Sequence, residues 1–456
     1  ISRYSFIVPD PLMELRLKDK KIIITMGGRS KSIDLERGNL RPLTFLRKML
    51  NLYRQVSLDT LPPFTGGLIG LVSYDFVNYL ERLPTTVVDD LKIPDIHFFL
   101  TSRVIAFDHV NKKCYLMLSP GASEIYTRFF EDLTPVSLPD DTHHMVDPSA
   151  VYSDAVDELS MTASELNDIP DTDYPLTPKR KKVQIHHELS LKDYSDMVIR
   201  AKQYIHDGDI FQANLSQRFS ATIGETEPVK LYSILRKINP SPFAFYADFG
   251  DYQIASSSPE RLIRLCKGIA ETRPIAGTRP RGLNAAADER LRADLLLNEK
   301  ERAEHIMLID LERNDLGKVC RYGTVEVNEL MTTEFYSHVI HIVSNVRGVL
   351  AEGRDAFSLL RATFPGGTIT GVPKVRCMEI IDELEKTARG PYTGSFGYIS
   401  FSGEMDMNII IRTFLIKDRT AYVQAGAGIV ADSDPEREYY ETIKKAEALL
   451  STLERL

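Results

Sequence analysis

The chain has 456 residues, of which 43% are hydrophobic and 26% charged, a composition typical of a globular protein with one large or several smaller domains. Its net charge of −8 and the lack of a basic stripe argue against nucleic-acid binding, and no apolar stretch is long enough to span a bilayer. Cys114, Cys266, Cys320 and Cys377 lack the spacing of a zinc site, so we expect reduced thiols in a cytoplasmic protein.

The first 139 residues alternate short apolar runs with a single helical pattern. Runs of β-branched and aromatic residues predict strands, and a proline before a 3.6-residue apolar period predicts a helix. The expected helix is Pro42–Tyr53, and the expected strands are Lys21–Met26, Leu68–Ser73, His97–Phe107 and Cys114–Leu118.

Residues 140–189 have a different composition. The stretch Asp140–Lys182 is rich in Asp, Ser, Thr and Pro and poor in large apolar residues. This composition predicts a polar, mobile connecting excursion, with a short helix near Ser153–Leu166. The basic run Lys179–Lys182 at its end is typical of a solvated loop.

Residues 190–456 return to a regular alternation. Ser190 and Asp193 form a capping box ahead of an apolar stripe that ends at Gly208, which predicts a helix. Mixed strands and helices of this spacing favour an α+β fold, a large sheet layered with helices. The further helices expected are Ala285 to about Asp310, Asp355–Thr363 and Lys374–Leu384, and the strands are Phe211–Phe219, Phe243–Phe249, Tyr252–Ser256, Arg261–Leu265, Val339–Val346, Gly394–Phe401, Asn408–Ile416 and Ala421–Gln424.

The C-terminal segment predicts a binding site. Asp434 before Pro435 is a strong helix start, and Glu438, Glu441 and Lys445 then recur on one face of that helix. Just before it, Gly426 and Gly428 allow backbone N–H groups to approach a ligand closely. Carboxylates beside exposed backbone donors suit a hard cation and an anionic small molecule bound together.

Two further segments allow both a structural and a functional interpretation. Glu304 borders the apolar run 306–309 of a helix; it is either part of a solvated face or, if Glu438 or Glu441 comes near, a ligand of Mg²⁺. The loop from Phe364 to Lys374 offers N–H groups and hydroxyls to anions but also suits a plain turn, and it lacks a Walker A motif.

Arg412 stands in the apolar strand Asn408–Ile416, where a buried guanidinium pairs with either a protein carboxylate or a substrate carboxylate. His338 and His341 are three residues apart in a strand-like run and cannot share a face of a regular strand, so one of them is structural. The spacing does not decide which.

Taken together, these segments resemble the chorismate-utilising synthases, the large synthase components of anthranilate and aminodeoxychorismate synthases. The resemblance covers nearly all of residues 190–456 and, more loosely, Arg3–Phe6, Gly66–Gly70 and Ser73–Asp75. The motifs that carry it are Gly208-Asp-Ile-Phe-Gln212, Ser257-Ser-Pro-Glu260, Pro274-Ile-Ala-Gly-Thr-Arg279, Ala303-Glu-His305, Asp315-Leu-Gly317, Gly390-Pro-Tyr392 and the segment from Gly426 to Lys445.

The resemblance implies a two-layer β-sandwich wrapped by helices, with the substrate site at its centre. Residues 1–139 would then be the N-terminal part of the sandwich, and residues 190–456 the chorismate-binding catalytic region. Glu304 and Glu441, with Glu438 close by, would bind Mg²⁺. The chorismate-binding residues implied are Thr368, Tyr392, Arg412, Gly426, Ala427, Gly428 and Lys445.

The resemblance also assigns catalytic positions. Glu260 is the expected general acid for departure of the hydroxyl, and His341, rather than His338, would sit by the ring. Gln212 stands where relatives that use water carry a lysine base, which favours ammonia as the nucleophile. Since no glutaminase nucleophile motif is present, the ammonia is expected from a separate glutamine amidotransferase subunit.

The choice of product stays open at this point. Ala276 stands where many aminodeoxychorismate synthases carry a lysine, which favours an anthranilate synthase. The segments Gln212–Leu215 and Gly366–Thr370 favour an aminodeoxychorismate synthase, and we adopt that interpretation. A regulatory site of the family is expected, and an inactive binding homologue is the remote alternative. The residues expected at the regulatory site are Arg3, Tyr4, Ser5, Asn239, Pro240 and Ser241.

Overall fold

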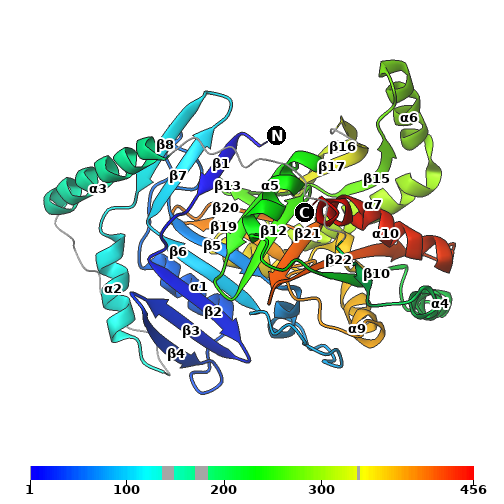
Figure 1. Cartoon of the computed structure of the whole chain (residues 1–456), viewed down its shortest axis with the longest axis horizontal. Coiled ribbons are helices and arrows are strands. Elements are labelled where there is room, and N and C mark those ends of the chain that lie inside the picture. The colour runs from blue at the N-terminus through cyan, green and yellow to red at the C-terminus, as the bar shows by residue number, and fades with distance from the viewer. Residues whose placement is uncertain (1, 136–147, 170–182, 336–338, 456) are drawn as a thin grey trace.

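A computed structural model describes residues 2–135, 148–169, 183–335 and 339–455 (Figure 1). Its strands form two large antiparallel sheets and one small one. The small sheet has the order β1-β7-β8, formed by Tyr4–Ile7, Arg103–Asp108 and Lys113–Leu118.

The larger sheet contains strands from both ends of the chain. At its middle, β5 (Gly67–Val72) pairs with β19 (Ser395–Ser400), and this pair joins the N-terminal strands to the C-terminal ones. In order across the sheet, the strands are β15 (Ile275–Pro280), β17 (Val339–Val349), β14 (Ile269–Thr272), β13 (Arg261–Cys266), β20 (Met405–Asn408), β19, β5, β6 (Ile96–Thr101), β2 (Met13–Lys18), β3 (Lys21–Met26) and β4 (Arg29–Asp34), with β16 (Glu326–Phe335) beside β17.

The second large sheet is built from residues after 185. Its long central pair is β10 (Gln212–Thr222) with β22 (Thr420–Ile429). In order, the strands are β11 (Phe243–Asp248), β12 (Tyr252–Ser258), β21 (Thr413–Lys417), β22, β10 and β18 (Gly371–Val372), with β9 (His186–His187) also paired to β10.

The two large sheets pack face to face. The rings of Phe245 on β11 and Phe396 on β19 stack with centroids 3.8 Å apart, and those of Phe99 on β6 and Phe249 lie 5.4 Å apart. Along β6, Phe98 belongs instead to the core on the opposite face, because successive side chains of a strand alternate between faces. The expected two-layer sandwich is therefore confirmed.

Helices cover the outer faces of the sandwich. On the larger sheet, buried residues of α1 (Pro42–Asn51), α2 (Ala122–Asp132) and α8 (Ala356–Thr363) join its core. On the second sheet, α4 (Leu191–His206), α5 (Pro228–Ile238) and α10 (Pro435–Leu453) pack on β10, β12 and β22. The remaining helical elements are η1 (Tyr74–Tyr79), α3 (Pro148–Asp168), α6 (Ala285–Leu297), α7 (Glu299–Gly317), η2 (Gly367–Ile369) and α9 (Lys374–Leu384).

Three predictions about elements were wrong. The single helix from Ala285 is two helices, because the Asn298 side chain accepts a hydrogen bond from Glu301 N–H and starts α7 afresh. The expected strand His97–Phe107 is two strands, β6 and β7, in different sheets. The expected strand Asn408–Ile416 is also interrupted, and Arg412 lies between β20 and β21 with φ of 52°, outside any strand.

Other local predictions are confirmed. The capping box of Ser190 and Asp193 starts α4, and the Asp434 carboxylate caps α10 by accepting from Arg437 N–H. The expected short helix near Ser153 is the longer α3, whereas the basic run at residues 179–182 and His338 lie outside the described residues.

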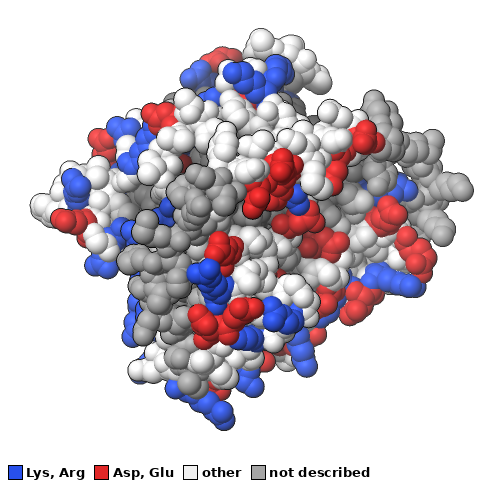
Figure 2. Space-filling view, turned by 90° about the vertical axis from the view of Figure 1, so that its left-hand side faces the viewer, with Lys and Arg blue, Asp and Glu red and all other residues white. Residues whose placement is uncertain are grey.

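On the face that Figure 2 shows, cationic and anionic side chains are intermingled among uncharged ones. No helix within the described ranges has the length and apolar character needed to cross a membrane.

Candidate active site

The pair of strands β10 and β22 forms one wall of the candidate site. Asn214 lies opposite Gly428, and Ser216 lies opposite Gly426. A Cβ atom on Gly426 would collide with the Asn214 side chain and the Tyr392 hydroxyl, and one on Gly428 would collide with Gln212 Nε2. The two glycines therefore let these three polar side chains approach the β22 backbone.

On the face of β10 that meets the two glycines, two side-chain oxygens have no hydrogen-bond partner among the described residues. They are Gln212 Oε1 and Asn214 Oδ1, and both are buried. A buried polar atom left without a partner costs free energy, so such atoms point to a bound group that supplies one. Asn214 was missed by the sequence analysis, because an asparagine in a strand gives no signal until its neighbours are known.

A buried ion pair holds this wall in place. Arg389 Nη2 lies 2.7 Å from Glu385 Oε1, and it also donates to the backbone oxygen of Asn214 at 2.7 Å. Glu385 in turn accepts from Ser216 N–H at 2.9 Å. Burial raises the pKa of Tyr392, and the nearby Arg389 acts in the opposite direction. At pH 7 the Tyr392 hydroxyl that faces Gly426 is therefore a neutral donor.

Glu260 is the buried carboxyl of the site. It is 6% exposed and accepts a hydrogen bond of 2.8 Å from the Thr368 hydroxyl of η2. Burial raises its pKa to about 7, although the hydrogen bond from Thr368 and the positive charges of Arg412 and Lys445 oppose the rise. A carboxyl with a pKa near 7 can both hold and release a proton at neutral pH, as a general acid must.

His341 lies on β17, close to Arg412. It is 3% exposed, and its Nδ1 is 2.9 Å from the Thr278 hydroxyl. Burial and, to a smaller extent, the charge of Arg412 lower its pKa to about 4, so the imidazole is neutral at pH 7. Ala276 belongs to the neighbouring strand β15, where it pairs with Ile342 of β17 just before a bulge at Gly277. Its methyl group offers no nucleophile.

The first turns of α10 bring charged groups to the other side of the glycine strand. Lys445 Nζ donates to the backbone oxygen of Gly426 at 3.1 Å and lies 2.8 Å from Glu441 Oε1. Negative charges of Glu438 and Glu441 contribute to the raised pKa of buried Tyr194, whose largest cause is burial. Lys445 of the predicted stripe therefore lies at Gly426, with Glu441 paired to it, and the charges of Glu438 and Glu441 both act on Tyr194.

Backbone donors, buried hydroxyls and the positive charges of Arg412 and Lys445 are groups suited to an anionic small molecule. The family model described as chorismate binding enzyme matches residues 12–451. The chain belongs to this family of chorismate-binding enzymes.

Three relatives illustrate where this chorismate-binding enzyme stands in the family. It is 42% identical to anthranilate synthase component 1 of Acetivibrio thermocellus, covering 99% of this chain and 87% of the relative. It is 40% identical to aminodeoxychorismate synthase component 1 of Bacillus subtilis, covering 99% and 89%. In structure it is similar to anthranilate synthase component I of Streptococcus pneumoniae, with a TM-score of 0.81 at 34% identity, covering 98% and 92%.

The carboxylates expected to bind Mg²⁺ come from two helices. Glu304 lies half-buried on α7, which contacts β15, β17 and η2, whereas Glu438 and Glu441 lie on α10. Within the described residues, no three His, Cys, Asp or Glu side chains come together as a metal-binding group. Mg²⁺ takes one or two protein carboxylates and completes its shell with water and substrate oxygens. The three expected carboxylates therefore are not assembled into one metal-binding group among the described residues, although each offers the oxygen donors that Mg²⁺ prefers.

A second buried carboxyl of the enzyme was missed by the sequence analysis. Glu312 on α7 is 5% exposed, and burial together with the nearby Asp315 raises its pKa to about 7. Lys374 lies 2.5 Å from Asp315, and the charge of Glu260 also reaches Glu312. The signal in the sequence was two carboxylates three residues apart among leucines, a pattern that a solvated helix face also produces.

The two halves of the expected regulatory site meet. Ser2, next to Arg3, donates to the backbone oxygen of Pro242, and Ser241 accepts a hydrogen bond of 3.2 Å from Ser257. Arg3 itself pairs with Asp108 at 2.9 Å, and Ser5 contacts His109. The start of the chain thus lies beside the loop that contains Asn239, Pro240 and Ser241, with Tyr4 opening β1.

Proposed function

We propose that this enzyme aminates chorismate with ammonia in a Mg²⁺-dependent reaction and yields 4-amino-4-deoxychorismate. The observation that supports ammonia as the nucleophile is Gln212, whose neutral side chain lies over Gly428 with a buried oxygen that has no hydrogen-bond partner in the part of the chain that the structure describes. An amide cannot remove a proton from water, so it cannot activate water for attack. Ammonia is nucleophilic without a base, and an amide oxygen can accept one of its hydrogens.

The polar groups around this position suit the two carboxylates of chorismate. Arg412 and Lys445 carry the positive charges, and both act on the buried Glu260. We assign Arg412, Tyr392 and the backbone of residues 426–428 to the enolpyruvyl carboxylate, and Thr368 to the pocket wall. A guanidinium can bind a carboxylate through two parallel hydrogen bonds, which orients the substrate as well as holding it.

The chemical step needs one proton donor. As the nitrogen of ammonia bonds to a ring carbon, the bond to the hydroxyl breaks, and the protonated carboxyl of Glu260 gives its proton so that water leaves. The new ammonium group then loses a proton to solvent. The neutral imidazole of His341 lies by the ring and can accept a hydrogen bond there.

Glu304, Glu438 and Glu441 would hold Mg²⁺, which supplies positive charge opposite the ring carboxylate. We expect Glu304→Gln and Glu441→Gln each to abolish Mg²⁺-dependent turnover and to weaken Mg²⁺ binding measured by calorimetry, with the fold retained. Glu436→Gln, an exposed carboxylate on the same helix, is the control. Normal Mg²⁺ binding and turnover in either of the first two variants would refute the assignment.

We assign the product from the sequence of the loop Gly366–Thr370, which contacts the general acid Glu260. Thr368, the donor to Glu260, belongs to the segment Gly366–Thr370 whose sequence favours aminodeoxychorismate synthases. Ala276 and the similarity to anthranilate synthases favour the alternative, in which the amine enters at another ring carbon and pyruvate leaves. Mass identification of the product from chorismate, Mg²⁺ and ammonium salt decides. Fluorescent anthranilate would overturn our assignment, and 4-aminobenzoate formed only after a lyase is added would support it.

We further propose that a separate glutamine amidotransferase subunit supplies the ammonia in the cytoplasm. The component 1 names of the relatives support a partner component. Glutamine should replace ammonium salt as the nitrogen source only when that subunit is added. If chorismate is not consumed under either condition, the chain is a binding homologue and not an aminating enzyme.

A further inference from the structure

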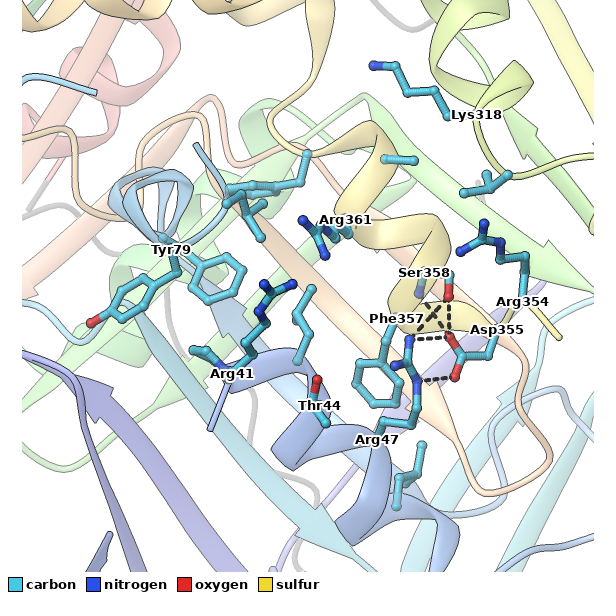
Figure 3. A pocket seen from close by; sticks show the side chains of 18 of the residues that line it. Arg41, Thr44, Arg47, Tyr79, Lys318, Arg354, Asp355, Phe357, Ser358 and Arg361 are labelled. Carbon is cyan, nitrogen blue, oxygen red and sulfur yellow. Dashed lines mark hydrogen bonds and ion pairs between the residues drawn. The ribbon is translucent and has the colours of Figure 1, made fainter. Parts of the chain in front are cut away.

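A large cleft lies apart from the candidate active site. It has a volume of ≈ 1420 Å³ and is lined by α1, η1, α8, the ends of α7 and α9, and the turn at residues 400–403 (Figure 3). None of its lining residues belongs to the group assigned to chorismate or to Mg²⁺. The cleft therefore needs an explanation of its own.

The lining of the cleft is strongly cationic. Its acidic residues are Glu81 and Asp355, whereas its cationic residues are Arg41, Arg47, Arg54, Arg82, Lys318, Arg354, Arg361 and Lys374. This excess stands out in a chain whose net charge is −8. A recess lined by charges of one sign focuses the electrostatic potential and raises the local concentration of oppositely charged ions.

Part of this charge is paired within the protein. Arg47 of α1 lies 2.6 Å from Asp355, the residue that caps α8, and it also donates to Ser358 (Figure 3). Lys318 and Lys374 both contact the buried carboxylate of Asp315. These pairs fix the walls of the cleft and neutralise Arg47, Lys318 and Lys374 with Asp355 and with Asp315, which lies outside the lining.

Five arginines remain. Arg54 donates a hydrogen bond of 3.3 Å to the Asn51 side chain, and Arg41, Arg82, Arg354 and Arg361 make no ion pair with any described residue. In Figure 3, Arg41 reaches from the start of α1 and Arg361 from α8 into the same space, so their guanidinium groups face one region from two elements. Like charges held close together repel each other, and a bound anion removes that repulsion.

The shape and chemistry of the cleft favour a small ligand. Beneath the arginines lies an apolar floor that includes Phe76, Phe357, Phe364 and Phe401, all buried. Guanidinium groups bind phosphate and carboxylate oxygens in pairs, and several such groups around one recess match several anionic groups on one molecule. A nucleic-acid backbone would instead need cations spread over an open surface.

We propose that this cleft binds a small polyanion, a molecule with two or more phosphate or carboxylate groups, at a site separate from that of chorismate. Arg41 and Arg361 provide the central contacts, and Arg82 and Arg354 extend them toward the rim. The anion takes the place of the missing acidic partners, while Arg47 and Lys374 keep the walls apart through their own pairs.

The test is calorimetry with two probes, inorganic pyrophosphate and citrate, each at fixed ionic strength. We expect at least one probe to bind at one site per chain, and the better binder shows whether phosphate or carboxylate is preferred. The double variant Arg41→Gln/Arg361→Gln should weaken that binding at least about tenfold, since it removes two charge-assisted contacts. The matched control is Arg290→Gln, an exposed arginine of α6 outside the cleft.

Two further measurements separate loss of anion binding from loss of folding or of activity. The circular dichroism of the double variant and its turnover of chorismate with ammonium salt should match those of the parent chain, which separates this site from the active site. The milder variant Arg82→Gln should weaken binding by a smaller factor. Failure of both probes to bind the parent chain, or equal binding by the double variant, would overturn the proposal whatever the outcome for chorismate.

Discussion

At the scale of single residues, the chemistry of this enzyme depends on what surrounds Glu260. Burial raises its pKa to about 7 from the ordinary glutamate value of 4.5, so the carboxyl is protonated below about pH 7 and ionised above it. Only the protonated form can give a proton to the departing hydroxyl. We therefore expect kcat, measured at constant free ammonia, to fall about tenfold per pH unit above about pH 7.

Replacing this acid tests the assignment directly. Glu260→Gln should lower kcat by about 10²–10⁴-fold and remove the alkaline fall, because the amide keeps the shape but donates no titratable proton. The control is Glu352→Gln, an exposed carboxylate, which should leave the pH profile unchanged. An unchanged profile in Glu260→Gln would mean that another group protonates the hydroxyl.

The second buried carboxyl, Glu312, has a consequence for stability. Its pKa is about 7 in the folded chain against an ordinary glutamate value of 4.5, because burial disfavours the charge. The folded state therefore favours the protonated form, and the stabilisation present below about pH 4.5 is lost as the pH rises through about 7. Glu312→Gln should raise the free energy of unfolding relative to the parent chain at pH 8, by about 3 kcal/mol at most, and by less at pH 5.

Urea unfolding at the two pH values measures this difference. If Glu312→Gln shifts the unfolding midpoint equally at both, Glu312 is ionised in the folded protein across the range, and the adjacent Lys374 and Thr272 must outweigh its burial.

The role of a residue could be predicted from the sequence where its type and local pattern have one common role. It could not be predicted where the same residue type has several common roles. Asp434 next to Pro435 predicted its cap correctly. Asn214 and Glu312 are ordinary in their local sequence, and only packing by distant segments buries their polar atoms. Arg412 was placed in a strand because its neighbours are apolar, although its backbone turns to positive φ there.

At the scale of elements, α10 depends on its first turn. The Asp434 carboxylate accepts from Arg437 N–H at 2.9 Å and satisfies a donor that has no partner inside the helix. Asp434→Ala should lower the free energy of unfolding by about 1 kcal/mol, measured by urea unfolding. Asp432→Ala, which removes an exposed carboxylate two residues earlier, should change it by less than about 0.5 kcal/mol. Equal effects of the two changes would rule out the cap as the cause.

The same capping chemistry explains an error of the sequence analysis. From Ala285 onward the apolar pattern continues through Asn298, and nothing in its period marks a break. Asn298 nevertheless ends α6 and caps α7, which places Glu304 on a separate helix. When the apolar repeat of a helix continues through a capping residue, the cap can be recognised only from the direction of the chain on both sides of it.

At the scale of the whole molecule, the sequence predicted the architecture through its resemblance to a family and not through its periodicity. Periodicity located most strands, yet the strand order follows from pairings between distant segments. The pair β5 and β19 joins residues more than 300 positions apart, with Leu68 opposite Ile399 and Val72 opposite Ser395. The larger sheet therefore combines strands from residues 13–101 with strands from residues 261–408.

This shared sheet predicts the behaviour of separate fragments. Without residues 1–135, β19 loses its partner β5 and presents an unpaired apolar edge, and the ring of Phe249 loses its contacts with His97 and Phe99. We expect residues 183–456 alone to aggregate or to lack the circular dichroism of the folded chain. Refolding them together with residues 1–135 should restore a soluble complex and turnover with ammonium salt. Folding of residues 183–456 as a soluble, chorismate-binding monomer would show that the second sheet and its helices hold the site unaided.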